Sequence, residues 1–276
     1  IYFHLLAETG SANNGGEHEH KDGLSFSLWA GNTPLALDPS YFGYENRDKI
    51  DESKHHNAIL IDAGNDIPED FTDEDLGVDD DYNGTDNYFA TPRLAFADVG
   101  SAFGEFWTHS REVNVKRNVY FVRNAYFLIA DNLSNLDGEY HSYDWMLHGN
   151  GHKTGQFTFD SQGKASWAPG GLDNQAGWKM QSRTAVSPDE GVSFVEHQFR
   201  HGISSEASVY HSSLDVRKTT TTQDAVFVSS IIPYDETRTG AEPVTKTNSD
   251  DTQTYRSIMV DNMVARVEDN FNYYKD

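Results

Sequence analysis

The sequence contains no cysteine among its 276 residues, which excludes disulfide bonds and thiolate metal ligands. Basic residues are scarce as well: 21 Lys and Arg stand against 44 Asp and Glu, for a formal net charge of −23. Nucleic acids and anionic lipid surfaces need clustered Lys and Arg, so we expect neither as a partner. Any polyanionic ligand would need a locally basic cleft.

Long hydrophobic runs are also missing. The longest apolar stretches, such as Tyr126–Ala130, are far too short to span a bilayer. The first residues do not resemble a signal peptide, and the chain opens at Ile1 instead of Met. We therefore expect a processed or excised part of a longer protein, with some of its functional site elsewhere.

Most of the chain shows period-two alternation of residues rich in Val, Ile, Phe, Tyr and Thr, bounded by Gly, Asn, Asp and Pro. No amphipathic helix of three turns is evident. The pattern predicts an all-β fold of a dozen or so strands, a large antiparallel β-sandwich in one domain over residues 1–276. The expected strands are 24–30, 58–62, 112–122, 125–131, 191–199, 204–211, 225–232 and 254–261.

An acidic insertion interrupts this pattern over residues 62–86, which hold 11 Asp and Glu and no Lys or Arg. One interpretation is a solvated loop. The other is a Ca²⁺ site, because residues 79–84 reproduce the first half of a calcium loop, with alternating oxygen ligands and a turn glycine. The closing Glu is absent, since Ala90 holds the twelfth position.

The densest group of chemically capable side chains lies between Glu17 and Asp62. Two imidazoles and a carboxylate at strand ends are the ligand types that zinc prefers when thiolates are missing. We nominate His20, Asp38 and His56 as ligands of a Zn²⁺ ion. His18 lies on the same side of an extended segment as His20, so it is free to face a substrate.

The geometry of this zinc site makes a demand on the backbone. A simple hairpin around residues 31–34 places Asp38 opposite Ser27. His20 precedes Ser27 by seven residues, so a fully extended chain would hold the two about 20 Å apart. The segment 20–23 must fold back, and Gly23 is a suitable pivot.

Other histidines carry weaker predictions. If His56 faces the site, His55 should point away from it. His148 is expected at a strand end near a groove. The alternating segment 196–201 is explained by an exposed strand face.

Taken together, these residues resemble the heparinase II/III-like C-terminal β domain of polysaccharide lyases. The ordered set covers roughly residues 15–150, and the rest of the chain matches only in its β character. The matching pieces are His18-x-His20-x-Asp22 before Leu24-Ser25-Phe26, Leu37-Asp38-Pro39, His56-Asn57, the run from Arg123 to Asp131, His141, and Trp145-Met-Leu-His148.

The resemblance implies a two-part enzyme, in which an N-terminal α/α toroid and this β domain hold an anionic polysaccharide between them. Such lyases cleave beside a uronic acid by β-elimination. By position in the motif, His18 corresponds to a substrate-facing histidine, and His20, Asp38 and His56 to zinc ligands. Tyr44, or less readily Tyr41, is expected to reach the cleft, while the family's main catalytic tyrosine lies in the toroid.

Two other functions remain open. A cupin-like metal enzyme would explain His18-x-His20. That family has a Glu three or four residues beyond the histidine pair, however, and this chain has Leu24 and Ser25 there. A non-catalytic carbohydrate-binding module would use tryptophans as sugar platforms; the chain offers Trp29, Trp107, Trp145, Trp167 and Trp178. The preferred prediction is a secreted or periplasmic bacterial lyase acting on alginate, or on a heparin-like, ulvan-like or other glycosaminoglycan polymer.

Overall fold

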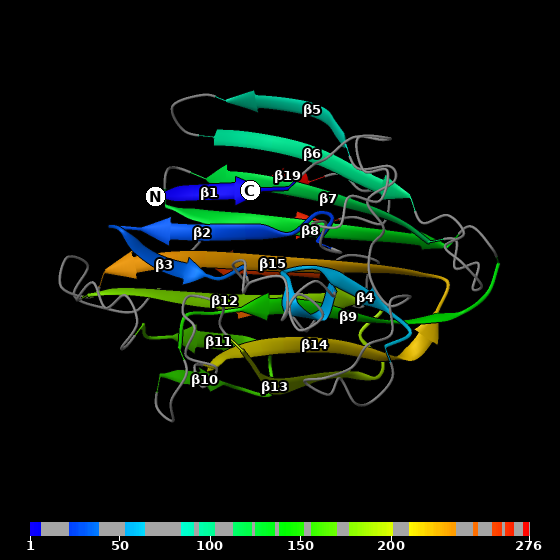
Figure 1. The fold of residues 1–276 in the computed structure, drawn as a ribbon. Coiled ribbons are helices and arrows are strands. Elements are labelled where there is room, and N and C mark those ends of the chain that lie inside the picture. The colour runs from blue at the N-terminus through cyan, green and yellow to red at the C-terminus, as the bar shows by residue number, and fades with distance from the viewer. Residues whose placement is uncertain are drawn as a thin grey trace, which may run out of the picture.

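The protein is described from a computed structural model (Figure 1). It describes residues 1–6, 22–38, 53–63, 84–90, 94–102, 113–122, 125–135, 138–151, 156–169, 177–200, 210–235, 245–247, 256–260, 263–267 and 273–275. Within these ranges the chain forms antiparallel strands, and the one helix is the 3₁₀ turn η3 (Ser53–His55). No helix in the described part of the chain is long and apolar enough to cross a membrane. The all-β prediction is confirmed.

An eight-stranded sheet forms the main layer, in the order β10-β11-β12-β15-β8-β7-β6-β5. Its central strands are long and pair without interruption. The strands are β5 (Gly84–Ala90), β6 (Leu94–Ala102), β7 (Val113–Val122), β8 (Tyr126–Asn135), β10 (Phe157–Phe159), β11 (Lys164–Trp167), β12 (Trp178–Ser187) and β15 (Asp224–Asp235).

Two smaller sheets form the layer that faces one side of the eight-stranded sheet. The first has the order β1-β2-β3, with β1 (Tyr2–Leu5), β2 (Phe26–Ala30) and β3 (Thr33–Ala36). The second has the order β13-β14-β9-β4, with β4 (Ile59–Ile61), β9 (His141–His148), β13 (Val192–Arg200) and β14 (Tyr210–Thr222). A bridge between Ala36 and Gly149 joins them, so the end of β3 lies beside the end of β9.

A last four-stranded sheet contains β16 (Thr245–Thr247), β17 (Arg256–Val260), β18 (Met263–Val267) and β19 (Tyr273–Lys275). Its strands β16 and β17 lie against β12 and β15. On that side the eight-stranded sheet carries a second apolar cluster, which includes Tyr126, Leu128, Val228 and Ile232. The large sheet is therefore apolar on both faces.

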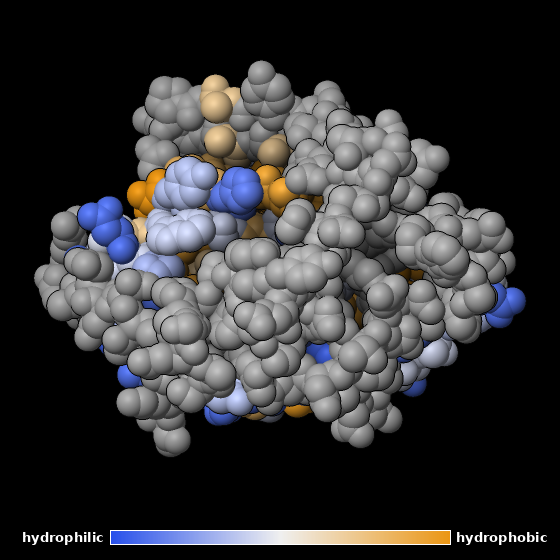
Figure 2. All heavy atoms as spheres, viewed as in Figure 1, coloured by the Kyte–Doolittle hydropathy of each residue, from blue (hydrophilic) through white to orange (hydrophobic). Residues whose placement is uncertain are grey.

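The main core fills the space between the eight-stranded sheet and the two smaller sheets. Alternate residues of β7 and β8, such as Val115 and Ile129, point into it and meet Leu28 of β2 and Trp145 of β9. On the surface drawn in Figure 2, hydrophilic and hydrophobic described side chains mix around β1 and β2, where Tyr2 is exposed.

The predicted strands agree with the observed ones to within a few residues for 24–30, 58–62, 112–122, 191–199, 225–232 and 254–261. β5 begins at Gly84, close to the predicted end of the acidic insertion at about residue 86. Two strand boundaries were wrong. The strand predicted at 125–131 continues to Asn135, and the strand predicted to end at His211 runs on to Thr222. The extension of β14 beyond His211 was missed because its end is polar and rich in Thr, and so shows no hydrophobic alternation.

Candidate metal centre

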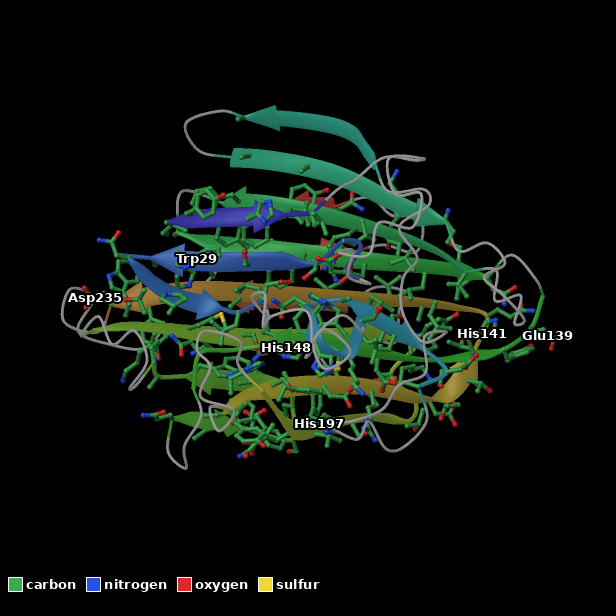
Figure 3. All side chains as sticks on the ribbon, viewed as in Figure 1. Trp29, Glu139, His141, His148, His197 and Asp235 are labelled. Carbon is green, nitrogen blue, oxygen red and sulfur yellow. The ribbon has the colours of Figure 1, made fainter. Side chains whose placement is uncertain are left out.

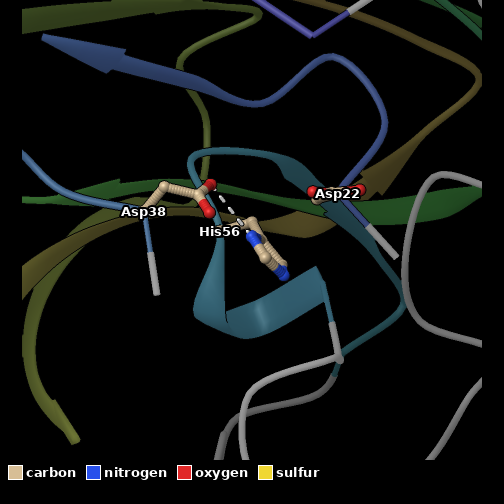
Figure 4. Close-up of side chains that lie close together, drawn as sticks. All are labelled: Asp22, Asp38 and His56. Carbon is tan, nitrogen blue, oxygen red and sulfur yellow. Dashed lines mark hydrogen bonds and ion pairs between the residues drawn. The ribbon is translucent and has the colours of Figure 1, made fainter. Parts of the chain in front are cut away.

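The structure brings Asp38 and His56 into direct contact (Figure 4). Asp38 follows β3, and His56 follows η3; the Nδ1 atom of His56 donates a hydrogen bond to Asp38 Oδ2 over 3.0 Å. The His56 side chain is completely buried, whereas that of Asp38 is 32% exposed. The pair thus opens to the surface through its carboxylate.

Asp22 completes a group of three. One ligand atom each from Asp22, Asp38 and His56 lie within 4.8 Å of one another. Asp22 belongs to the sequence motif but was not among the predicted ligands. A signal was present, because Asp22 continues the period-two spacing of His18 and His20 along one side of an extended segment.

The backbone makes a tight turn over residues 22–25, in the described part of the segment that the predicted metal site required to fold back. The amide N–H of Ser25 donates to the carbonyl of Asp22 over 2.8 Å, which closes a tight turn. Leu24, not the predicted pivot Gly23, takes the left-handed conformation, with φ of 64°. A leucine rarely adopts it, so the surrounding contacts must hold it there. The Leu24 side chain is buried, and its carbonyl accepts a hydrogen bond from Arg117.

The hairpin between β2 and β3 brings Asp38 back towards this turn. Gly31 and Asn32 form a two-residue turn with φ of 53° and 62°, the left-handed pair that tight hairpins favour. A bulge then shifts the register, so that Leu28 pairs with Ala36. Continuing this register sets Asp38 opposite Phe26, not Ser27 as the simple hairpin predicted, because the two-residue turn and the bulge were not foreseen.

Asn57 links the strands around the site through its side-chain amide. Its Nδ2 atom donates to the carbonyls of Phe26 and Leu37 over 2.6 and 2.8 Å, and its Oδ1 atom accepts the backbone N–H of His148 over 2.7 Å. Asn57 is fully buried. Since it directly follows His56, this residue fixes the imidazole relative to β2, β3 and β9.

Ser25 connects Asn57 to the carboxylate. Its hydroxyl accepts the backbone N–H of Asn57 over 3.1 Å and donates to Asp38 Oδ2 over 3.0 Å. Hydrogen bonds of this kind orient a carboxylate before any ion arrives.

A buried ion pair between β7 and β8 supports the site. Arg117 donates from Nε and Nη2 to the two oxygens of Asp131, over 2.6 and 3.0 Å, and the indole N–H of Trp145 donates to the same carboxylate over 2.8 Å. Arg117 and Asp131 are both 0% exposed. The Nη1 atom of Arg117 donates to the carbonyls of Leu24 and Asn57, and so ties together the two backbone segments beside Asp22 and His56.

A cluster of histidines surrounds Phe199 beyond the candidate metal centre. His55 points away from Asp38, as predicted, and its ring contacts Phe199 edge-on at 5.2 Å. His148 lies at the end of β9 (Figure 3) and is completely buried, with Nδ1 2.7 Å from His211 Nε2. Burial lowers the pKa of His148 well below its ordinary value, and His55 and His56 lower it further. His148 is therefore neutral at physiological pH.

Residues 196–199, the described side chains of the segment 196–201, are less exposed than predicted. Glu196 and Gln198 are exposed, but Phe199 is buried and His197 Nε2 lies 2.9 Å from Asp215 Oδ2 and 3.1 Å from Arg217 Nη2. Asp215 also accepts from Arg217 Nε over 2.5 Å, and Arg217 lies 3.7 Å from Asp144. Burial, and then the neighbouring Asp215, raise the pKa of Asp144 to about 8.

Several sequence predictions fall outside the described residues. These are His18, His20, Tyr41 and Tyr44, the calcium-loop segment 79–83 and Trp107. Of the other tryptophans proposed as sugar platforms, Trp145 and Trp167 are buried in the core, which removes them as candidates. Trp29 on β2 is half-buried and contacts Tyr2, with ring centroids 5.6 Å apart (Figure 3).

The donor set fits a divalent cation. Two carboxylates and one imidazole are ligands that zinc accepts, and their charge would be neutralised by a doubly charged ion.

The chain belongs to the family described as heparinase II/III-like, C-terminal, whose model matches residues 2–257. No curated protein matches it in sequence.

Two solved structures share the fold of this chain. A heparan sulfate lyase, HepC from Pedobacter heparinus, superposes with a TM-score of 0.70 at 12% identity, over 96% of this chain and 38% of that one. A heparinase III, the BT4657 gene product, gives a TM-score of 0.69 at 14% identity, over 99% of this chain and 38% of that one. The chain thus spans well under half the length of these proteins, and the likeness establishes the fold.

Replacing Arg117 tests the supporting ion pair. Arg117→Met leaves the Asp131 carboxylate buried without the guanidinium that balances its charge. We therefore expect a loss of about 3–5 kcal/mol in the free energy of unfolding, measured with urea. Lys116→Met on the same strand is the control and should cost less than about 1 kcal/mol. Arg117→Met/Asp131→Leu should recover part of the loss. Equal stability of the two single variants would contradict the assignment.

The raised pKa of Asp144 predicts a pH dependence of stability. The folded state holds a proton on Asp144 between the ordinary pKa of 3.8 and about 8, and the unfolded state does not, so stability falls as pH rises through that window. Asp144→Asn should flatten this slope and gain at least about 1 kcal/mol over the wild type at pH 8. Urea unfolding at pH 5 and pH 8 measures it, with the exposed Asp160→Asn as control. An unchanged slope in Asp144→Asn would refute the prediction.

Proposed function

We propose that this chain is the β domain of a secreted or periplasmic polysaccharide lyase, which binds a structural zinc ion and lines one wall of the substrate cleft. The observation that carries the proposal is the convergence of Asp22, Asp38 and His56 in a domain of the heparinase II/III-like family. The fold it shares with a heparan sulfate lyase supports the same function.

In this proposal His20, Asp38 and His56 hold the ion, and Asp22 is a fourth candidate ligand. His20 precedes Asp22 by two residues in the sequence. Zinc bound here would fix the turn after Asp22 against the end of β3 and the residues after η3. Loss of the ion would loosen the wall of the cleft and not remove a reacting group.

The substrate of the proposed enzyme is an anionic polysaccharide that contains uronic acid, either alginate or a glycosaminoglycan or ulvan-like polymer. In β-elimination a base removes the C5 proton, the bond from C4 to the leaving oxygen breaks, and an unsaturated uronate remains. A proton α to a carboxylate is weakly acidic, so polar groups must stabilise the charge that develops.

His18 and Tyr44 are the residues of this chain that we assign to the chemistry. His18 either neutralises the uronate carboxylate or takes the C5 proton, and Tyr44 supplies a second acid–base group at the cleft. A positioned acid or base contributes typically 10²–10⁴-fold to the rate. An N-terminal α/α toroid of the same protein would supply the opposite wall.

The zinc proposal is tested with two matched aspartates. Asp38 and Asp62 are 32% and 31% exposed, and each contacts a histidine Nδ1, at 3.0 and 2.8 Å. Asp38→Asn should weaken zinc binding at least about a hundredfold and abolish the drop in melting temperature on chelation, whereas Asp62→Asn should change neither. Metal analysis and melting curves with and without chelator give the readout. A zinc-free wild type, or equal behaviour of the two variants, would contradict it.

The lyase proposal is tested on the full-length parent protein. Absorbance of the unsaturated uronate should rise on at least one polymer of a panel that contains alginate, heparan sulfate, chondroitin sulfate and ulvan. His18→Ala should lower kcat at least about a hundredfold on that polymer. If no polyuronate yields the chromophore, the lyase assignment is wrong.

A further inference from the structure

An apolar groove of about 410 Å³ follows β1, between this strand and the outer part of the eight-stranded sheet. Residues of β1, β6, β7 and β8 line it, together with Ile1, and every one of them is aliphatic or aromatic. None belongs to the candidate metal centre. In Figure 2 hydrophobic residues, drawn in orange, border β1. Open apolar surfaces of this kind mark interaction sites.

The floor of the groove is the core face of the large sheet, continued past β1. Ala97 of β6 pairs with Val119 of β7, and Ala95 pairs with Phe121, so all four side chains point to one side of the sheet. Val119 is buried in the main core, whereas Ala95 and Ala97 are half-buried and Ala90, the partner of Ala95 on β5, is exposed. Among the described strands β1 is the last of its layer, and Figure 1 shows β5 and β6 beyond it.

The wall of the groove is the free edge of β1. Among the described strands β1 pairs with β2 alone. The N–H of Leu6 donates to the carbonyl of Ser25, the residue opposite it in the same register, over 2.8 Å. Because bonded and non-bonded pairs alternate along an antiparallel ladder, Phe3 and Leu5 direct their N–H and C=O groups away from β2, towards the groove.

The two sides of the groove fit an added β-strand. An extended segment laid along β1 would bond to the free backbone groups of Phe3 and Leu5, as in β-strand addition. Facing sheets pack about 10 Å apart, so the small side chains of Ala95 and Ala97 leave room for bulky apolar residues at every second position of that segment. An acidic saccharide would find no charged group in this lining.

We propose that the groove holds a β-strand formed by the residues directly before Ile1 in the parent protein, which turns back at Ile1 and runs antiparallel to β1. Ile1 itself lines the groove, so a preceding segment would start there. The chain covers 38% of each of the two solved structures that share its fold, in keeping with a longer parent. That the parent continues before Ile1 rests on the proposed function; that the groove takes a strand rests on β1 and β6.

A strand from the same polypeptide is favoured over a second copy of the chain. β1 has four residues and is about 13 Å long, so pairing of two such edges would bury far less than the about 1,200 Å² of a specific interface. A segment joined to Ile1 has a high effective concentration at the groove and needs no such area. The added strand would extend the sheet β1-β2-β3, whose last strand leads to Asp38, and so fix the N-terminal domain relative to the candidate metal centre.

Disulfide mapping in the full-length parent protein tests the strand. The 276 residues contain no cysteine, so His4→Cys adds one thiol to them, on the exposed side of β1. His4 and the residue opposite it on the added strand form a non-hydrogen-bonded pair, whose Cα atoms lie close enough for a disulfide. A second cysteine is placed in turn at each of the ten positions before Ile1. We expect a disulfide at one position and at least tenfold less at the positions on either side of it.

A matched control and the alternative occupants give the other outcomes. Asn114→Cys, on the exposed side of β7, should form a disulfide with none of the ten positions. Failure of His4→Cys to form a disulfide at any of them, or its pairing only with His4→Cys of a second molecule, would overturn the proposal. Neither result would change the proposed function, which the unsaturated product of the same parent tests. A parent without residues before Ile1 would overturn both this strand and the N-terminal domain.

A second variant tests the groove without a disulfide. Ala97→Asp places a charge beneath the added strand, so the melting temperature of the parent should fall by about 5 °C or more. In the 276-residue chain, where the groove is open, the same change should lower it by less than about 2 °C. Asn114→Asp should shift neither protein by more than that. Equal shifts of parent and chain on Ala97→Asp would contradict a covered groove.

Discussion

The buried ion pair between Arg117 and Asp131 is the interaction on which the candidate metal centre depends. Two charges with no exposure are costly in a core unless their hydrogen bonds are met, and here Trp145 and two backbone carbonyls meet them. Those carbonyls belong to Leu24 and Asn57, so one guanidinium fixes the turn after Asp22 and the residue after His56. The pair thus links the packing of the sheets to the positions of Asp22 and His56 in the candidate site.

The strands could be predicted from the sequence because, in both layers of a sandwich, side chains that face the core alternate with side chains that face away along each strand. Val113, Val115 and Val119 repeat on one face of β7, and the strand was placed to within one residue. The same pattern contained a signal that was missed. Arg117 lies between Val115 and Val119 on this apolar face, where a charged side chain needs a buried partner. The order of the sheets could not be predicted, since alternation does not say which strands pair.

The candidate site was predicted in part. Asp38 and His56, separated by 17 residues, lie together as their residue types suggested, and Asp22 joins them from the segment that had to fold back. The left-handed leucine and the β2–β3 bulge could not be foreseen, because tertiary contacts impose both. The roles of His18, His20 and Tyr44 remain predictions from the motif. Arg117, Ser25 and Asn57 act through hydrogen bonds that no spacing rule reveals.

Anomalous diffraction from crystals of the zinc-soaked chain tests the central claim most directly, because it locates the ion without reference to activity. The account predicts one strong peak at the zinc edge, about 2.0–2.2 Å from a nitrogen of His56 and an oxygen of Asp38. A peak at other side chains, or none at full zinc occupancy in solution, would contradict it.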